Sequence, residues 1–354
     1  MTTRRSLLAA PLALAACERF AAAGPVTAQA ITPLKSAPFP VGTACKTSHI
    51  VDPAWVALAR THISQLTPEW EMKMEYILGD GPGRLRFDSP DRLAAFAKAQ
   101  GVPMHGHTLI WYSQGQQAFA GLDDAAFDRA FDGYIAAVAG RYRGIARSWD
   151  VVNEPILDDG SGLRDCHWSQ RYGQDGYILR AFEKAQAADP DAVLFLNEYN
   201  LEGVPAKGAT FLRLVERLLK AGCPLQGIGT QSHLWIDIEA GAIAASIRDL
   251  AQFGLPIHVS ELDVTLRTDN PLDLRPQAER MARQVDRVTE LAEAFVALPA
   301  AQRFAFTVWG LRDTDSWYRQ GEKDDGKDRP LPFDGAGNPN PMAVALARAF
   351  GTAT

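Results

Sequence analysis

The chain has 354 residues, of which 47% are hydrophobic and 22% are charged, and its formal net charge at pH 7 is -6. This composition supplies enough apolar surface for one large core. Acidic and basic residues are interspersed, so the chain has no basic stripe to neutralise a phosphate backbone, which excludes nucleic acid as an expected partner.

The first thirty residues are typical of an export signal. Arg4 and Arg5 precede an apolar stretch, residues 7–16, that is too short to span a bilayer. The adjacent arginines resemble a twin-arginine signal, which would imply export of the folded protein, and an ordinary secretory signal is the alternative. We therefore expect residues 1–30 to be removed and the protein to be periplasmic or extracellular.

Two processing sites compete within this segment. Residues 28–30 (Ala-Gln-Ala) have the small-residue pattern of a signal peptidase site. Residues 14–17 (Leu-Ala-Ala-Cys) resemble a bacterial lipoprotein box, which would leave a lipidated Cys17 as a membrane anchor. Both alternatives stay open at this point.

From about residue 40 onward, apolar strand-like runs alternate with amphipathic helical stretches, which is typical of a parallel sheet. Three helical stretches, 91–100, 206–221 and 238–253, are followed by Gly-x-Pro. Glycine suits the left-handed position that ends a helix, and proline prevents the helix from continuing. The strand candidates lie near residues 41–45, 62–67, 102–109, 147–153, 192–197, 226–231, 256–261 and 303–309.

Eight strands alternating with helices predict an α/β fold of the TIM (β/α)8 barrel type, and we expect residues 31–354 to form this single domain. An open doubly wound sheet would have fewer strands and a glycine-rich phosphate loop after the first one, and the sequence has no such loop. Polar residues follow most strand candidates. In a TIM barrel the carboxyl ends of the strands form the rim that carries the active site.

Two glutamates at this rim are the most informative residues. Glu154 and Glu261 each close a run of β-branched residues, on the predicted fourth and seventh strands. A carboxyl pair is typical of enzymes that cleave glycosidic bonds, because one group protonates the leaving oxygen and the other meets the oxocarbenium-like carbon. The structural alternative is that each glutamate only pairs with a nearby Arg or Lys.

Five segments, in order along the chain, resemble the motifs of glycoside hydrolase family 10. They are His-Gly-His-Thr-Leu-Ile-Trp (105–111), Trp-Asp-Val-Val-Asn-Glu (149–154), Thr-Gln-Ser-His-Leu (230–234), Ser-Glu-Leu-Asp-Val (260–264) and Trp-Gly-Leu-Arg-Asp-Thr-Asp-Ser-Trp (309–317). The resemblance runs from about residue 40 to the C-terminus. It implies a TIM barrel with endo-1,4-β-xylanase activity on xylan and xylo-oligosaccharides, without a cofactor or metal ion. We expect a monomer with no obligate protein partner.

The resemblance also implies roles for individual residues. Glu154 would be the general acid/base and Glu261 the nucleophile of a retaining mechanism, with the two carboxyl groups about 5 to 5.5 Å apart. Asn153 would bind the 2-hydroxyl of the sugar being cleaved, His233 would hydrogen-bond the nucleophile, and Asp263 would orient His233.

Further positions match residues that contact substrate in the family. The expected polar contacts are Lys73, His107 and Gln231. The expected aromatic walls are Trp111, Trp309 and Trp317, because the C–H faces of pyranose rings pack well on indole. Tyr199 is expected in a supporting position, with a purely structural hydrogen bond as the alternative.

Two positions depart from the family pattern. Trp70 stands where the family commonly has Asn, and Tyr112 stands where it often has a second His. The first change removes a polar contact for the sugar next to the cleaved one and supplies an aromatic face. Catalysis should survive, whereas the sugar preference of the glycone subsites is left open.

Three other functions compete with this interpretation. Another retaining β-1,4-glycanase, a cellulase or mannanase, would share the Asn-Glu-Pro sequence at residues 153–155. A metal-dependent barrel hydrolase is suggested by His105 and His107 as an H-x-H pair, but it would need further ligands at other strand ends. A non-catalytic carbohydrate-binding protein would have no reason to keep both glutamates. Cys45, Cys166 and Cys223 allow one disulfide at most, and their spacing indicates no metal site.

Overall fold

A computed structural model of the chain describes residues 30–79, 81–268, 270, 272–324 and 326–351. The predicted export signal, with Cys17 and all but the last residue of the competing cleavage site, lies outside these residues. No helix in the described part of the chain is long and apolar enough to cross a membrane.

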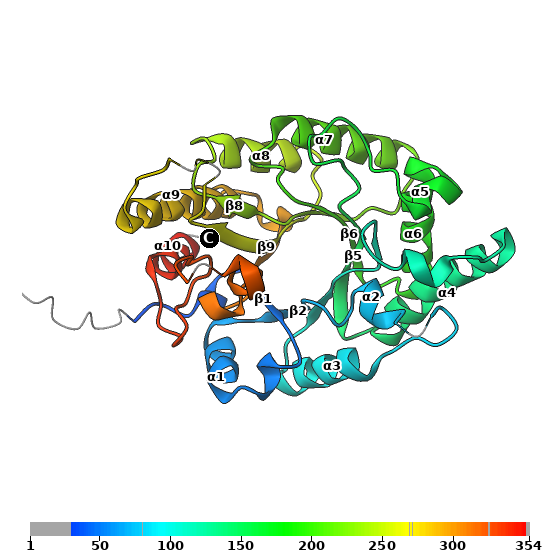
Figure 1. Cartoon of the computed structure of the whole chain (residues 1–354), viewed down its shortest axis with the longest axis horizontal. Helices are drawn as coiled ribbons and strands as arrows, with labels where there is room; N and C mark the ends of the chain where they lie inside the picture. The colour runs from blue at the N-terminus through cyan, green and yellow to red at the C-terminus, as the bar shows by residue number, and fades with distance from the viewer. Residues whose placement is uncertain (1–29, 80, 269, 271, 325, 352–354) are drawn as a thin grey trace, which may run out of the picture.

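Eight parallel strands close into a barrel at the centre of the molecule (Figure 1). They are β1 (Val41–Cys45), β2 (Gln65–Pro68), β3 (Met104–Gly106), β5 (Ala146–Asn153), β6 (Val193–Glu198), β7 (Gly227–Thr230), β9 (Ile257–Thr265) and β10 (Arg303–Val308). The barrel is closed because β1 pairs with both β2 and β10, and β10 pairs with β9. The predicted TIM (β/α)8 fold is confirmed.

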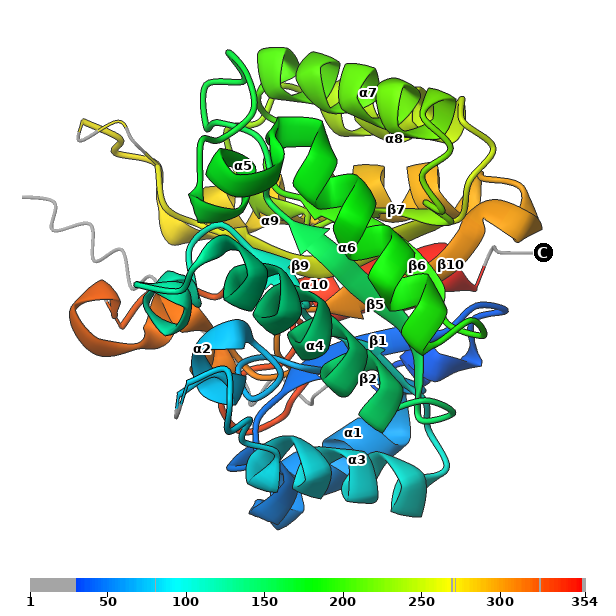
Figure 2. The ribbon, with the colours of Figure 1, turned by 90° about the vertical axis from the view of Figure 1, so that its right-hand side faces the viewer.

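Helices surround this barrel on the outside (Figures 1 and 2). They are α1 (Pro53–His62), α2 (Met74–Ile77), α3 (Asp88–Gln100), α4 (Asp124–Arg141), α5 (His167–Tyr172), α6 (Gln174–Ala188), α7 (Pro205–Lys220), α8 (Ala242–Ala251), α9 (Gln277–Val296) and α10 (Pro341–Phe350). The short helices α2 and α5 and the segment after β10, drawn in orange, lie toward the same end of the barrel (Figure 2). These segments follow the carboxyl ends of β2, β5 and β10, so that end is the rim where the site is expected.

The strand predictions agree in position and differ at their ends. The predicted second strand starts three residues too early, because His62 still belongs to α1. The predicted third strand stops at Gly106 in the structure, and a two-residue strand, β4 (Ile110–Trp111), then pairs with β5. The predicted seventh strand is longer than expected, because β8 (His233–Trp235) pairs with its end.

Helix ends follow the local chemistry of the sequence. Gly101, Gly222 and Gly254, each predicted to end a helix, all have a positive φ, at 68°, 79° and 68°. The predicted third helix begins four residues later than expected, at Ala242. Gly241 adopts φ 89° before it, and a left-handed residue cannot continue a right-handed helix.

The barrel interior is filled by large rings opposite small residues. The rings of His105 and His258 lie 4.5 Å apart and those of Phe195 and Phe304 lie 4.6 Å apart, measured between centroids. Gly227 leaves the room for Phe195, because a Cβ there would lie 2.3 Å from the ring. This packing closes the barrel below the rim, so the chemistry is confined to the rim itself.

The three cysteines of the described chain are free thiols. Cys45, Cys166 and Cys223 are all buried and all free, so no disulfide forms among them. Burial raises the pKa of the Cys223 thiol to about 12. The Cys223 thiol is therefore a poor nucleophile, and all three side chains pack as small apolar groups.

Candidate active site

Glu154 lies directly after the last residue of β5, where the chain turns sharply. Its φ of 57° is unusual for a residue with a side chain, and its N–H donates to the carbonyl of Asn197 at 2.9 Å. Three hydrogen bonds hold the carboxyl group: Trp111 Nε1 donates to Oε2 at 2.8 Å, and Asn153 Nδ2 and Gln231 Nε2 donate to Oε1 at 3.0 Å each. All three donors are neutral groups.

Glu261 lies on β9 and has a different environment. Asn197 Nδ2 donates to its Oε1 at 2.8 Å, and His233 Nε2 lies 3.4 Å from its Oε2. Nδ1 of His107 is 3.8 Å from Oε1. Burial raises the pKa of Glu261, but His107, His233 and Lys73 outweigh burial and lower the pKa below its usual value. This carboxyl group is therefore held ionised.

Amide side chains connect the two carboxyl groups across the barrel mouth. Asn197 Nδ2 donates both to Asn153 Oδ1 at 2.9 Å and to Glu261, and Ser260 Oγ donates to Asn197 Oδ1 at 2.8 Å. Gly229 makes this arrangement possible, because a Cβ there would lie 2.3 Å from Asn197 Oδ1. The two glutamates thus belong to one continuous hydrogen-bond network.

A half-buried histidine and a buried aspartate extend the network beyond Glu261. Nδ1 of His233 lies 3.0 Å from Asp263 Oδ1, and Trp317 Nε1 donates to Asp263 Oδ2 at 2.8 Å. Burial alone would lower the pKa of His233, but Asp263 and Glu261 raise it to about 10. Burial in turn raises the pKa of Asp263, against the effect of His233. His233 therefore carries a positive charge between the two carboxyl groups.

Asp150 holds two further histidines on the other side. Its Oδ2 lies 2.9 Å from His107 Nδ1 and 2.8 Å from His105 Nε2. Burial raises the pKa of Asp150, but the two histidines lower it well below its usual value. His105, predicted inside the barrel or behind the site, lies in this second position. His107, Asp150 and Glu261 have ligand atoms within 4.8 Å of one another, a group that could hold a metal ion.

The donors of that group are already engaged with each other in the pairs just described. A metal ion would have to replace the ion pairs of Asp150 and the hydrogen bond of Glu261 to Asn197. In zinc sites, one ring nitrogen of a histidine binds the metal, and the other donates its hydrogen to a nearby carboxylate or carbonyl group. The donor set therefore fits a charge network better than a metal site.

Aromatic rings and one cation line the site. Lys73 Nζ lies 5.0 Å from the Trp111 ring centroid and 5.8 Å from that of Trp309. The Trp309 ring meets His107 edge to face at 5.2 Å. Trp317, half-buried, packs against His233 at 5.8 Å. The three tryptophans expected to form apolar walls therefore all surround the carboxyl pair.

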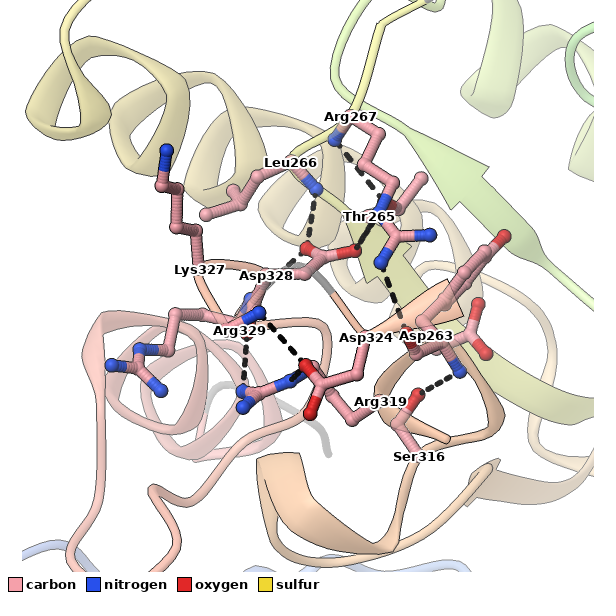
Figure 3. Close-up of polar contacts among 12 residues, drawn as sticks. Asp263, Thr265, Leu266, Arg267, Ser316, Arg319, Asp324, Lys327, Asp328 and Arg329 are labelled. Carbon is pink, nitrogen blue, oxygen red and sulfur yellow. Dashed lines mark hydrogen bonds and ion pairs between the residues drawn. The ribbon is translucent and has the colours of Figure 1, made fainter. Parts of the chain in front are cut away.

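The loop that carries Trp317 is fastened to the end of β9 (Figure 3). Asp328, which is buried, accepts from Thr265 Oγ1 at 2.6 Å and from the Leu266 N–H at 2.9 Å. Arg267 donates to the carbonyl of Tyr318 at 3.0 Å (Figure 3). These contacts fix the short helix η6 (Trp317–Arg319) beside Asp263.

The two positions that depart from the family pattern lie at the edge of the site. The Trp70 side chain is 40% exposed and meets Tyr76 edge to face at 6.5 Å. Tyr112 is half-buried, with the guanidinium of Arg164 4.1 Å from its ring centroid. Trp70 therefore presents an aromatic face to solvent, whereas Tyr112 is covered by an arginine.

Ten of the predicted residues are joined by the contacts above, and Lys73 faces them through Trp111 and Trp309. Tyr199 has structural partners instead: its hydroxyl bonds Asp158 and accepts from Arg164 Nη2 at 2.7 Å. Asp150 and Asn197 belong to the network but were not among the predicted site residues. An acidic residue in the middle of an apolar strand was the available signal for Asp150. The available signal for Asn197 was its place as a polar residue at the end of a strand.

Comparison with known proteins assigns the family. The sequence profile of Glycosyl hydrolase family 10 matches residues 31–349. The chain belongs to this family. Among the relatives of this family 10 chain, endo-1,4-beta-xylanase A of Cellvibrio japonicus is 33% identical over 310 residues, covering 79% of the chain and 50% of that protein. The exoglucanase XynX of Acetivibrio thermocellus is 31% identical over 325 residues, covering 87% of the chain and 28% of that protein.

This family 10 chain is also similar to a solved xylanase structure. A variant of Cellvibrio japonicus xylanase 10C in complex with xylopentaose has a TM-score of 0.83 and 28% identity, over 91% of this chain and 69% of that one. The chain spans half the length of the Cellvibrio relative and about a quarter of the Acetivibrio relative.

Proposed function

We propose that this family 10 glycosyl hydrolase is a retaining endo-1,4-β-xylanase, with Glu154 as general acid/base and Glu261 as nucleophile. The observation that carries the proposal is the contrast between the two carboxyl environments. Glu154 receives hydrogen bonds from neutral donors, whereas Glu261 faces a positively charged His233 and has a lowered pKa. Two carboxyl groups whose surroundings differ in this way divide the acid and nucleophile roles between them.

The proposed reaction has two displacements. In the first, Glu261 attacks the anomeric carbon while Glu154 gives its proton to the leaving glycosidic oxygen, which forms a covalent glycosyl-enzyme. In the second, Glu154 takes a proton from water as that water attacks the same carbon, and Glu261 is released. Two inversions at one carbon retain its configuration.

The supporting residues fit this sequence of steps. Asn153 lies between Glu154 and Asn197, where it can meet the 2-hydroxyl of the sugar at the cleavage point. His233, held by Asp263, keeps Glu261 ionised and aimed. Lys73, Trp111, Trp309 and Trp317 supply one cation and three rings for the neighbouring sugars.

The relatives support xylan as the proposed substrate. The Cellvibrio relative is named an endo-xylanase, and the solved neighbour binds xylopentaose. The Acetivibrio relative is named an exoglucanase, which makes β-1,4-glucan the alternative to test. Product analysis on xylan, cellulose and mannan distinguishes xylanase activity from activity on the other β-1,4-glycans. We expect xylo-oligosaccharides of several lengths early in the reaction, and faster hydrolysis of cellulose or mannan than of xylan would contradict the assignment.

We also propose that the protein acts outside the cytoplasm, because Arg4, Arg5 and the apolar stretch after them are typical of an export signal. We further propose that it acts as a monomer, because one chain supplies both glutamates and the groups that hydrogen-bond them. Fractionation of cells that express the full chain tests the location. Activity in the periplasm or medium with a mature N-terminus at residue 31 would support cleavage after Ala30, whereas a lipidated Cys17 in the membrane fraction would support the lipoprotein alternative.

A further inference from the structure

A fully buried ion pair lies behind Glu154. Lys207 Nζ is 2.9 Å from Glu198 Oε1, and both side chains are 0% exposed. Lys207 lies in the first turn of α7, where the helix dipole disfavours a positive charge. Taking both charges out of water is also unfavourable unless the geometry compensates. The contacts of Lys207 are Glu198 and the ring of Tyr199, whose centroid lies 3.2 Å from Nζ, and of these two Glu198 carries the charge that the lysine balances.

Glu198 holds the backbone on one side of Glu154. Its Oε2 accepts from the Ile156 N–H at 3.0 Å and its Oε1 accepts from the Tyr199 N–H at 3.0 Å. On the other side, the N–H of Glu154 donates to the carbonyl of Asn197, the residue before Glu198. The end of β6 therefore hydrogen-bonds the turn at Glu154 itself, through Asn197, and after it at Ile156, through Glu198. That turn needs such support because Glu154 has a left-handed φ.

The pair also sets the charge near Glu154. Burial raises the pKa of Glu198 to about 7, Lys207 opposes that rise and Glu154 adds to it. An interaction between two carboxyl groups acts on both, so the charge of Glu198 is felt at Glu154. The other titratable or charged groups around them are Tyr112, Asp158, Arg164, Tyr177 and Tyr199. Asp158 and Arg164 pair with each other, which leaves Lys207 as the direct partner of Glu198.

We propose that Glu198 and Lys207 are a positioning pair for Glu154. The carboxylate of Glu198 fixes the turn that aims the acid/base, and Lys207 favours the ionised form of that carboxylate and balances its charge. The inference rests on the proposed function, because it assigns a support to the acid/base of that reaction. It concerns residues that hold the backbone next to Glu154, not residues that contact the sugar.

The charge part of the proposal is tested by the pH dependence of kcat/KM on phenyl xylobioside, whose poor leaving group needs the acid. Glu198→Gln keeps the shape but leaves Lys207 uncompensated. A positive charge favours the ionised form of Glu154, so the alkaline limb should move to lower pH by roughly half a unit. The double variant Glu198→Gln/Lys207→Met should return the limb to its wild-type position. An unmoved limb in the first variant, or a persisting shift in the second, overturns the charge role.

The positioning part is tested by leaving-group dependence. Glu198→Ala/Lys207→Met removes the acceptor for the Ile156 N–H and leaves no unpaired charge. Hydrolysis of xylan should fall about tenfold, whereas glycosylation by 2,4-dinitrophenyl xylobioside, which needs little protonation, should fall less than about twofold. Glu198→Gln/Lys207→Met keeps an acceptor and should recover most of the xylan rate. Equal losses on both substrates, or no loss on either, overturns the proposal.

Controls separate this proposal from its premises. Arg217 lies on α7, the helix that carries Lys207, and pairs at the surface with Asp175 of α6 at 2.9 Å. Arg217→Met breaks this pair and should change neither the pH profile nor the leaving-group dependence. If Glu198→Gln does not fold, as judged by circular dichroism, the leaving-group comparison still decides. A wild-type protein that hydrolyses no β-1,4-xylan overturns the proposed function itself. An active wild type whose variants behave as wild type overturns only the positioning pair.

Discussion

Replacing Asp263 by Asn tests whether a charged His233 keeps Glu261 ionised. The substitution keeps the shape and one of the two acceptor oxygens, which can serve either His233 Nδ1 or Trp317 Nε1, and it removes the negative charge. Asp263 is the largest of the influences that raise the pKa of His233 to about 10. Without it, burial should dominate, and His233 should be neutral throughout the range in which the enzyme is assayed.

The size of the effect follows from that pKa. A rise from 6.5 to about 10 corresponds to roughly 5 kcal/mol, at about 1.4 kcal/mol per pKa unit, and it is what remains of the effects of Asp263 and Glu261 after burial has opposed them. An opposite charge within about 4 to 6 Å lowers a carboxyl pKa by about one to three units. Loss of the charge on His233, 3.4 Å from Glu261, should therefore raise the pKa of Glu261 by about one unit or more.

The assay is the pH profile of kcat/KM on an aryl xylobioside. Because Glu261 must be ionised to attack, a raised pKa moves the acid limb of the profile to higher pH by about one unit. Asp175→Asn, which removes one partner of a surface pair with Arg217, is the matched control and should not move this limb. An acid limb that stays in place in Asp263→Asn would refute the charge role of His233.

Stability gives a second readout of the same charge. A folded-state pKa above the unfolded value means that the stabilisation is complete below about pH 6.5 and is lost as the pH rises to about 10. The difference in unfolding free energy between the wild type and Asp263→Asn should therefore shrink across that window. Denaturant titrations at several pH values measure it, and a constant difference would contradict the expected titration.

Four further predictions follow from the site. Glu261→Ala should abolish xylan hydrolysis, and azide should restore turnover on an activated xylobioside and give a glycosyl azide of inverted configuration; a product of retained configuration would exclude Glu261 as the nucleophile. Glu154→Ala should lose far less in the glycosylation step with a good leaving group than with xylan, and equal losses would make the acid assignment wrong. Trp111→Phe removes the 2.8 Å bond to Glu154 and should lower kcat on xylan about tenfold, as expected for a hydrogen bond worth about 1.5 kcal/mol, and an unchanged kcat would separate Trp111 from the acid. Dialysis against a chelator should leave activity unchanged, because His107, Asp150 and Glu261 are already paired, whereas a loss reversed by a divalent cation would show a metal site.

The sequence predicted the barrel and much of its rim for a physical reason. Parallel strands buried on both faces read as continuous apolar runs, and the polar residues that interrupt them mark the strand ends. Glu154 and Glu261 were visible in this way. The short strands β4 and β8 were not, because two or three residues carry no periodicity of their own.

Residues whose role depends on distant neighbours were beyond the reach of such patterns. Asn197 joins the network because Gly229, on the next strand, leaves room for its amide. Lys207 reads as an ordinary exposed residue at a helix start, and only the packing of α7 against the loop after β5 buries it beside Glu198. Tyr199 matched a family position, but its hydroxyl is taken by Asp158 and Arg164.

The pairing of β1 with β10 brings together segments more than 250 residues apart in the chain. Trp309 follows β10 directly, and Trp317 lies in the next loop, so the last wall of the sugar site exists only after the ring of strands has closed. A growing chain therefore cannot complete the proposed sugar site until β10 and the loop that carries Trp317 have emerged. With the same topology, activity tests whether the whole barrel has folded. A protein cut between β9 and β10 would keep both glutamates but would be inactive until its two pieces reassociated.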